Sequence, residues 1–369
     1  AAAALGEAHE PRRGLPGWLE AAAEEPFVGR RAAVDAALCA LDRAAAGCTT
    51  VVLVQGEAGG GKSRLLAEVA RLAAGRGTAV WAGRWDRHQA VPFRALVEAL
   101  DSLLADVPAS VRAGLAESPL APLLPGRPPA PAADLSTDSD AEQLGLFDGV
   151  ARLVSAAVGT RPGLLVLDDL HWACRGSMLL VRHLLRSRPR MPLCVLLATR
   201  PTAGLGEDHR VLLDELLTLP GAVAVDLEGL SVTEVAALPA LASLAEAHGE
   251  PPMALAPWVA GASGGNPLLV SRILEDPAYV GRSRRPHGGS CDGHRPESVP
   301  ARLRAAVAAL VDELPAPTRQ VLAVGALLGV EVDPRILRSA LGAGVDAALL
   351  EGQRGGILRP DGHRLRFVH

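Results

Sequence analysis

Continuous apolar runs alternate along the chain with segments whose apolar side chains recur at helical spacing. The first run, Thr49–Gln55, is followed by Lys62–Ala74, in which Leu65, Leu66 and Val69 fall on one helical face. Because strands without polar alternation must be covered on both faces, this order predicts an α/β fold with a parallel sheet between helices. Further predicted strands are Thr78–Gly83, Gly163–Asp168, Pro192–Thr199 and Ala222–Leu227, and further predicted helices are Pro92–Leu104, Ser177–Leu185 and His209–Leu217.

The last third of the chain is predicted to be mainly helical. Ser231 and Glu234 have the spacing of a capping box and open a helical segment over 231–279. Farther on, helices and a hairpin across Asp361-Gly362 predict a winged-helix-like domain over 300–369. Its expected elements are helices at Arg302–Leu314, Ala316–Leu328, Pro334–Leu341 and Ala347–Gly355 and strands at Gly356–Arg359 and His363–Val368.

Composition shifts divide the chain further. We expect a flexible tail over 1–24, a sheet domain over 25–230 and a Gly/Arg/Pro-rich linker over 280–299. A Pro/Ala/Asp-rich stretch over 118–140 predicts a flexible insertion within the sheet domain. The chain has no initiator Met and stops at His369, so we expect a longer protein and a truncated winged-helix-like domain.

Charge and composition exclude several classes of protein. The chain carries 37 basic and 41 acidic residues, a net charge of −4, which excludes a dominant polybasic arm or acidic tail. Its 49% hydrophobic content excludes disorder throughout. Five cysteines without a C-x-x-C pair predict neither a disulfide framework nor a zinc site. No apolar run approaches the roughly 18 residues that span a bilayer, and no signal peptide is evident, so the expected compartment is the cytoplasm without membrane partners.

Two residue types are almost missing from the sequence. Lys62 is the only lysine among the 37 basic residues, and Asn266 is the only asparagine. Lysine, asparagine, isoleucine, phenylalanine and tyrosine are all scarce, which indicates a coding bias toward G and C. In such a chain, a position that keeps lysine or asparagine is expected to need that residue type, because other residues cannot take over its role.

The lone lysine lies in a glycine-rich loop with the pattern G-x-x-x-x-G-K-[ST]. Such a loop wraps backbone N–H groups around a phosphate, and the following helix directs its positive N-terminus at the same anion. Lys62 is expected to bridge the β- and γ-phosphates, and the Ser63 hydroxyl to bind Mg²⁺. The alternative is an ordinary glycine-rich turn, but a predicted strand precedes this loop and a predicted helix follows it. The expected nucleotide contacts are Gly56, Glu57, Ala58, Gly59, Gly60, Gly61, Lys62, Ser63 and the adjoining Arg64.

Polar residues end two of the predicted strands. Asp168 is expected to hold Mg²⁺ and Asp169 to orient or deprotonate the attacking water, as in a Walker B strand. Alternatively, the two acids cap the next helix. Arg200 follows the strand Pro192–Thr199 and is predicted to sense the γ-phosphate. A solvated arginine at a strand end is the other interpretation.

Three segments together resemble the STAND branch of AAA+-related P-loop ATPases. They are Phe27–Arg30 before the loop, Leu167–Ala173 around the acidic pair, and Gly264–Pro267 after the sheet. The similarity is to the N-terminal ATPase module of large LuxR-type transcriptional regulators in particular. It implies that Val28, Gly29 and Arg30 contact adenine and ribose. It also implies that Gly265 and Pro267 bring a helical lid, 231–279, onto the nucleotide.

The resemblance implies a slow ATPase that uses ATP or ADP with Mg²⁺ as a switch. Cys174 stands where the family usually has an acidic residue, and Asp169 where many AAA+ ATPases have glutamate, so slow hydrolysis is expected. ATP would permit self-association, and DNA would be bound only by a C-terminal domain outside this chain. One alternative attaches the same module to a cyclase or Ser/Thr kinase. The other is a stand-alone AAA+-like motor, which should show an arginine finger and pore loops that we do not find.

Overall fold

The computed structural model describes residues 14–24, 26–86, 92–124, 140–159, 161–201, 206–276, 299–355 and 357–367. A five-stranded sheet has the order β2-β3-β4-β1-β5, and every neighbouring pair of its strands is parallel. Every residue of β3 and β4 is buried, which explains their unbroken apolar sequence. The strands are β1 (Thr50–Gly56), β2 (Ala79–Arg84), β3 (Gly163–Asp168), β4 (Leu193–Thr199) and β5 (Val223–Leu227).

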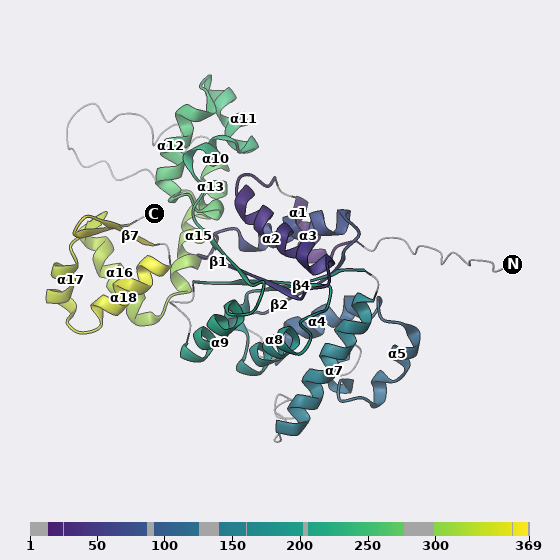
Figure 1. Ribbon diagram of the computed structural model, residues 1–369. Helices are drawn as coiled ribbons and strands as arrows, with labels where there is room; N and C mark the ends of the chain where they lie inside the picture. Colours follow the sequence, from purple (N-terminus) through teal and green to yellow (C-terminus); the bar gives the residue numbers. More distant parts are fainter. Residues whose placement is uncertain are drawn as a thin grey trace, which may run out of the picture.

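Helices cover both faces of this sheet (Figure 1). Alternate strand residues point to opposite faces: Val52 and Val54 pack toward α1, α2 and α3, whereas Val51 and Leu53 pack toward α4, α7, α8 and α9. The predicted fold class, a P-loop-type parallel sheet with helices on both faces and a helical region after it, is therefore confirmed. The helix bounds are α1 Gly17–Glu24, α2 Arg31–Ala45, α3 Lys62–Gly75, α4 Arg94–Leu103, α5 Ala109–Ala113, α7 Asp140–Val158, α8 Arg175–Ser187 and α9 Glu207–Leu217, with short turns η1 Leu115–Glu117, η2 Ala121–Leu123 and η3 Leu170–Trp172.

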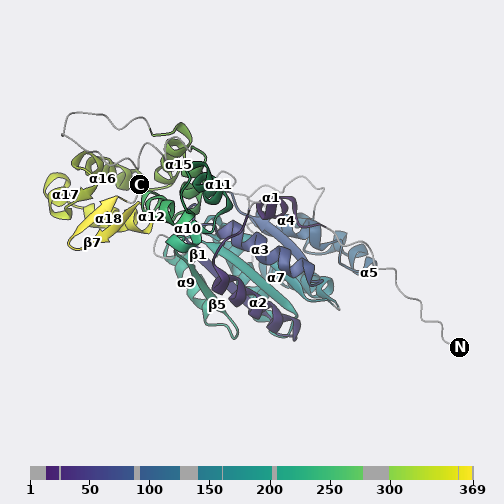
Figure 2. The same cartoon turned by 90° about the horizontal axis from the view of Figure 1, so that it is seen from above.

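The C-terminal region is helical and ends in a small sheet. Figure 2 shows that this region lies together at one end of the parallel sheet. The small sheet is antiparallel, with the order β6-β8-β7. The elements are α10 Val232–Ala236, α11 Pro239–His248, α12 Pro252–Ser263, α13 Pro267–Leu274, α15 Ala301–Asp312, α16 Ala316–Leu328, α17 Pro334–Leu341, α18 Val345–Arg354, β6 Glu331–Val332, β7 Leu358–Asp361 and β8 Arg364–Phe367.

One apolar core runs through all of these C-terminal helices. Val259 and Ile273 from α12 and α13 belong to the same cluster as Leu310 and Leu322 from α15 and α16. The sequence predicts two separate units on either side of 280–299, because that stretch has a linker composition. In the structure α13 packs on α15. A movement at the end of α15 therefore acts on a core that extends into 231–276.

Two segments that were predicted to be flexible contain packed residues. Gly17–Glu24, within the predicted tail 1–24, form a helix whose Leu19 is fully buried against the sheet domain. The predicted insertion 118–140 begins with a packed turn, where Leu120 and Leu123 are buried. Apolar burial explains both corrections, because Leu19, Leu120 and Leu123 lose solvent exposure that a flexible segment would keep. Residues 1–13, 125–139 and 280–298 lie outside the described residues.

Some elements were not predicted from the sequence. Among them are α2, which begins after the predicted tail, and α7, which begins at the last residue of the predicted insertion. The helical segment predicted over 231–275 consists of four helices, and two of the three breaks between them lie at Gly249 and Gly264, which have positive φ angles of 66° and 59°. Strand β6 is only two residues long and gives no alternation to detect. Val368 and His369, at the end of the predicted hairpin, lie outside the described residues.

None of the helices in the described part of the chain has both the length and the apolar character that crossing a membrane requires.

Candidate nucleotide-binding site

The glycine-rich loop joins the end of β1 to the start of α3. Gly59 and Gly61 have φ angles of +70° and +87°, in the left-handed region that favours glycine. Gly60 donates its N–H to Glu57 O at 3.0 Å, and a Cβ added at Gly60 would lie 2.8 Å from that same oxygen. The loop thus requires glycine at three successive positions, and α3 begins directly after it with its N-terminus at the loop.

Lys62 is folded into this loop. Its Nζ donates to the carbonyl oxygens of Gly56 and Glu57, each at 2.9 Å, and the residue is only 7% exposed. Burial lowers the pKa of its ammonium, while the nearby carboxylates of Asp169 and Asp168 act in the opposite direction. A compact ammonium fits between two carbonyls, whereas a planar, forked guanidinium would not.

Asp168 ends β3 beside the first turn of α3. Ser63 Oγ donates to Asp168 Oδ2 at 2.5 Å, and Asp168 is completely buried. The other carboxylate oxygen accepts the backbone N–H of Asp169 at 2.8 Å. A hydroxyl and a carboxylate are oxygen ligands of the kind Mg²⁺ takes, and the ion usually fills its remaining positions with water and phosphate. The pair therefore fits Mg²⁺, although no cluster of three His, Cys, Asp or Glu occurs among the described residues.

Asp169 lies at the mouth of the site in a strained backbone conformation. Its φ of +57° is left-handed, and its carboxylate is about one-third exposed. Burial, followed by the charge of Asp168, raises the pKa of Asp169 to about 6. Asp169 occupies the N-cap position of η3 but makes no side-chain cap bond there, which disfavours the helix-capping interpretation.

His171 and Trp172 follow the acidic pair and pack beside it. Their rings lie 4.8 Å apart between centroids, and the imidazole is nearly buried. Burial, assisted by the charges of Arg200 and Lys62, lowers the pKa of His171 to about 3. His171 is therefore neutral at physiological pH, which suits packing rather than charge stabilisation.

Arg200 follows β4, which lies between β3 and β1 in the sheet. Its guanidinium forms an ion pair with Glu313 at 2.7 Å and lies 5.5 Å from the centre of the Trp172 ring. Its side chain is only 24% exposed, which disfavours a freely solvated arginine. Glu313 directly follows α15, so the C-terminal region reaches the phosphate loop through this contact.

The segment Phe27–Arg30 borders an apolar cavity beside the loop. The cavity has a volume of about 330 Å³, within the range of small-molecule sites. Arg30 donates its backbone N–H to Glu234 Oε1 at 2.9 Å, which ties this segment to α10. A Cβ added at Gly29 would lie 2.1 Å from that same carboxylate oxygen, so Gly29 permits this close approach. The lining residues are Pro26, Phe27, Val28, Arg30, Gly61, Arg64, Leu230, Leu238, Pro239, Ala240, Pro267, Val270, Ser271 and Leu274.

More than half of this lining comes from residues that were not predicted as contacts. Leu238, Val270 and Leu274 belong to the helical lid predicted over 231–279, in which Gly265 and Pro267 were the predicted contacts. The spacing of Val270 and Leu274 at i and i+4 on α13 is the sequence signal that would have marked them. Gly265, a predicted contact, does not line the cavity: its carbonyl accepts the backbone N–H of Leu230 at 2.7 Å.

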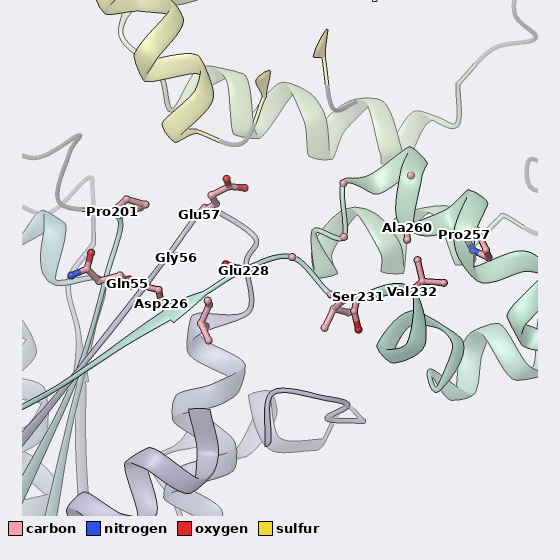
Figure 3. Close-up of a pocket in the computed structure, with 16 residues that line it drawn as sticks. Gln55, Gly56, Glu57, Pro201, Asp226, Glu228, Ser231, Val232, Pro257 and Ala260 are labelled. Atoms are coloured by element: carbon pink, nitrogen blue, oxygen red, sulfur yellow. The ribbon is translucent and has the colours of Figure 1, made fainter. Parts of the chain in front are cut away.

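Gly265 instead borders an open groove between the ends of β1 and β5 and the helices α10 and α12 (Figure 3). Figure 3 shows side chains from the ends of β1 and β5 facing Ser231, Val232, Pro257 and Ala260 across it. The chain crosses from the sheet into α10 at Glu228–Ser231, along the groove. This crossing is the covalent connection between the sheet domain and the helices that cover the loop.

Asn266 fastens the helical segment to the phosphate loop. Its Nδ2 donates to Ala58 O at 2.9 Å, and its Oδ1 caps α13 by accepting the N–H of Leu268 at 3.1 Å. A Cβ added at Gly59 would lie 2.8 Å from Asn266 Oδ1. The lone asparagine therefore serves two roles at once: helix cap and cross-link to the loop.

We expect Asn266→Ala to lose both roles and Asn266→Ser to lose only the cross-link. Serine is a good N-cap but is too short to reach Ala58, so Asn266→Ser should retain the helix. Losing a cap costs about 0.5–2 kcal/mol. Thermal unfolding should show the loss for alanine alone, while ADP affinity should fall in both variants. Equal affinity in Asn266→Ser and wild type would mean that the Ala58 contact does not shape the loop.

Comparisons with known proteins bear on these residues. Residues 26–196 match the family model described as an AAA ATPase domain. No curated protein matches the chain. Among solved structures, the chain is similar to a STAND protein with a tetratricopeptide repeat sensor from Pyrococcus horikoshii, at 17% identity over 94% of this chain and 42% of that one, with a TM-score of 0.39. It is also similar to the ORC2 protein of Aeropyrum pernix, at 16% identity over 94% and 91% of the two chains, with a TM-score of 0.47.

The chain spans 42% of the length of the STAND protein. Drosophila ORC bound to DNA is a further similar structure, at 13% identity over 92% of each chain, with a TM-score of 0.42. The family match covers Phe27–Arg30, the phosphate loop, Asp168 and Asp169, whereas Arg200 and Asn266 lie beyond it. The segment that carries the phosphate loop and its acidic strand end therefore matches the AAA ATPase domain family.

Proposed function

We propose that this chain is a STAND-type switch module that binds ATP or ADP with Mg²⁺ and hydrolyses ATP slowly. The observation that carries the proposal is the contact between Ser63 and Asp168 beside a loop that buries Lys62. Phosphates would bind the loop's N–H groups and Lys62, and the adenine would fill the apolar cavity next to Val28 and Pro267. Ser63 and Asp168 would hold Mg²⁺, which supplies charge neutralisation at the phosphates when bound.

Asp169 is positioned to act on the water that attacks the terminal phosphate. Its carboxylate lies next to the proposed Mg²⁺ ligand Asp168 and is partly open to solvent. A carboxylate there can orient the water and accept its proton. Arg200 would contribute positive charge near the terminal phosphate, provided that its pairing with Glu313 is released.

Slow turnover separates the switch from a motor. Arg200 is paired with Glu313, and this pairing would reduce the charge that Arg200 offers a terminal phosphate, so we expect steady-state ATP hydrolysis well under about 10 per second. A coupled-enzyme assay that detects ADP release measures the rate. Motor-like turnover would favour the stand-alone AAA+-like alternative instead.

We further propose that nucleotide state controls self-association, as a module of a LuxR-type transcriptional regulator would require. The shared core of α12, α13, α15 and α16 lets a change at the loop move the whole C-terminal region as one body. DNA would be bound by a domain outside this chain. Light scattering after gel filtration should show a larger mass with a non-hydrolysable ATP analogue than with ADP. An identical mass in both states would contradict the switch.

A Ser/Thr kinase or cyclase attached to the same module remains a second candidate output. A DNA-binding assay on the full-length protein distinguishes the two, since specific binding to promoter DNA would identify the regulator.

A further inference from the structure

Glu313, a residue of the C-terminal region, places a carboxylate beside the phosphate loop, where it pairs with Arg200. It follows α15, and its Oε2 lies 2.7 Å from Arg200 Nη2. That oxygen is buried and accepts no hydrogen bond of ordinary geometry from the described residues. Both side chains of the pair are partly exposed, at 24% and 30%, so another anion can reach Arg200 and compete with the carboxylate for its charge.

The pair lies directly next to the phosphate loop. Arg200 and Glu313 line a cavity of about 280 Å³ together with Glu57 and Ala58 of the loop. The two charges also reach Lys62: besides burial, the largest cause, Arg200 lowers the pKa of Lys62 and Glu313 raises it. The Glu313 carboxylate therefore lies within electrostatic range of the lysine that would meet the phosphates.

A third phosphate would compete with this carboxylate. It would bring negative charge toward both Lys62 and Arg200, where Glu313 already places a negative charge paired with Arg200. Like charges repel strongly at short range in a partly buried site, and Arg200 cannot pair fully with both anions. A nucleoside diphosphate lacks this third phosphate and therefore leaves the Arg200–Glu313 ion pair intact.

We propose that Glu313 lowers the affinity of this site for a nucleoside triphosphate relative to the diphosphate. It does so by staying paired with Arg200 until a γ-phosphate takes its place. The inference rests on the proposed nucleotide-binding function. Displacing Glu313 releases the end of α15, and Leu310 on that helix belongs to the core that continues into α12 and α13. The γ-phosphate is thereby coupled to the C-terminal region through one ion pair.

The test compares binding of ADP and of a non-hydrolysable ATP analogue, both with Mg²⁺, to the full chain by calorimetry. Glu313→Gln keeps the size of the side chain and removes its charge. We expect its affinity for the ATP analogue to rise about tenfold, with ADP affinity within about twofold of wild type. Asp312→Asn is the matched control, since Asp312 is the adjacent acidic residue and is 75% exposed. The control should change neither affinity.

A double variant that lacks the charges of both Arg200 and Glu313 tests whether the effect depends on their pairing. In the Arg200→Gln background, Glu313→Gln should give a smaller gain for the ATP analogue, because no guanidinium is left to release. An unchanged ratio of the two affinities in Glu313→Gln, with both nucleotides still bound tightly, would overturn this inference alone. Absence of binding by the wild-type chain would overturn the proposed function as well. Should Glu313→Gln unfold, Glu313→Ala provides the same comparison.

Discussion

Replacing Lys62 with alanine should reduce the affinity for Mg·ATP at least about 100-fold, the equivalent of losing a charge-assisted hydrogen bond of about 2–3 kcal/mol. The buried ammonium bridges two carbonyls of the loop, so its loss removes the phosphate contact and two contacts that shape the loop. Competition against a fluorescent ADP analogue measures the affinity.

Two matched variants make this result specific. Lys62→Arg keeps the charge but places a fork where the two carbonyls leave room for a compact ammonium, so it should also bind weakly. Arg71→Ala removes a cation from an exposed position on the same helix, where Arg71 pairs with Glu68, and should bind like wild type. ATP affinity unchanged in Lys62→Ala would remove the loop from the binding site.

Replacing Asp169 with asparagine should leave nucleotide binding intact and reduce the hydrolysis rate by about 100- to 10,000-fold, the range of a lost general base. Asparagine has the same shape but cannot accept the proton of the attacking water. Single-turnover hydrolysis measures the chemical step separately from product release.

Asp168→Asn is the informative comparison for this variant. Asp168 accepts the Ser63 hydroxyl and is completely buried, so its replacement should weaken Mg²⁺-dependent binding as well as the rate. A wild-type rate in Asp169→Asn would exclude this side chain from the reaction, whatever the behaviour of Asp168→Asn.

The sheet and the loop could be predicted because local sequence determines them. The buried strands carry apolar residues on both faces. The glycines of the loop adopt backbone conformations that other residue types adopt only with strain. The ends of β1, β3 and β4 lie at one edge of a parallel sheet, so strand assignments alone bring the loop, Asp168 and Arg200 together. The G-x-x-x-x-G-K-[ST] pattern places the lone Lys62 in the loop.

What could not be predicted depends on contacts between distant segments. The partner of Arg200 lies 113 residues later along the chain, and nothing in its local pattern distinguishes Glu313 from the neighbouring Asp312. Asn266 stands out in the sequence as the lone asparagine, but its bond to Ala58 depends on how α13 docks on the loop. The helix at Gly17–Glu24 was missed because eight residues rich in alanine and glutamate give little periodicity, although its buried Leu19 anchors it.

The central claim is that one nucleotide binds in the loop around Lys62 together with Mg²⁺. Calorimetric titration of the wild-type chain with ADP, in the presence and absence of Mg²⁺, tests it most directly. We predict a single site per chain whose affinity increases when Mg²⁺ is present. If the folded chain gave no binding heat with ADP, either with or without Mg²⁺, this result would contradict the claim.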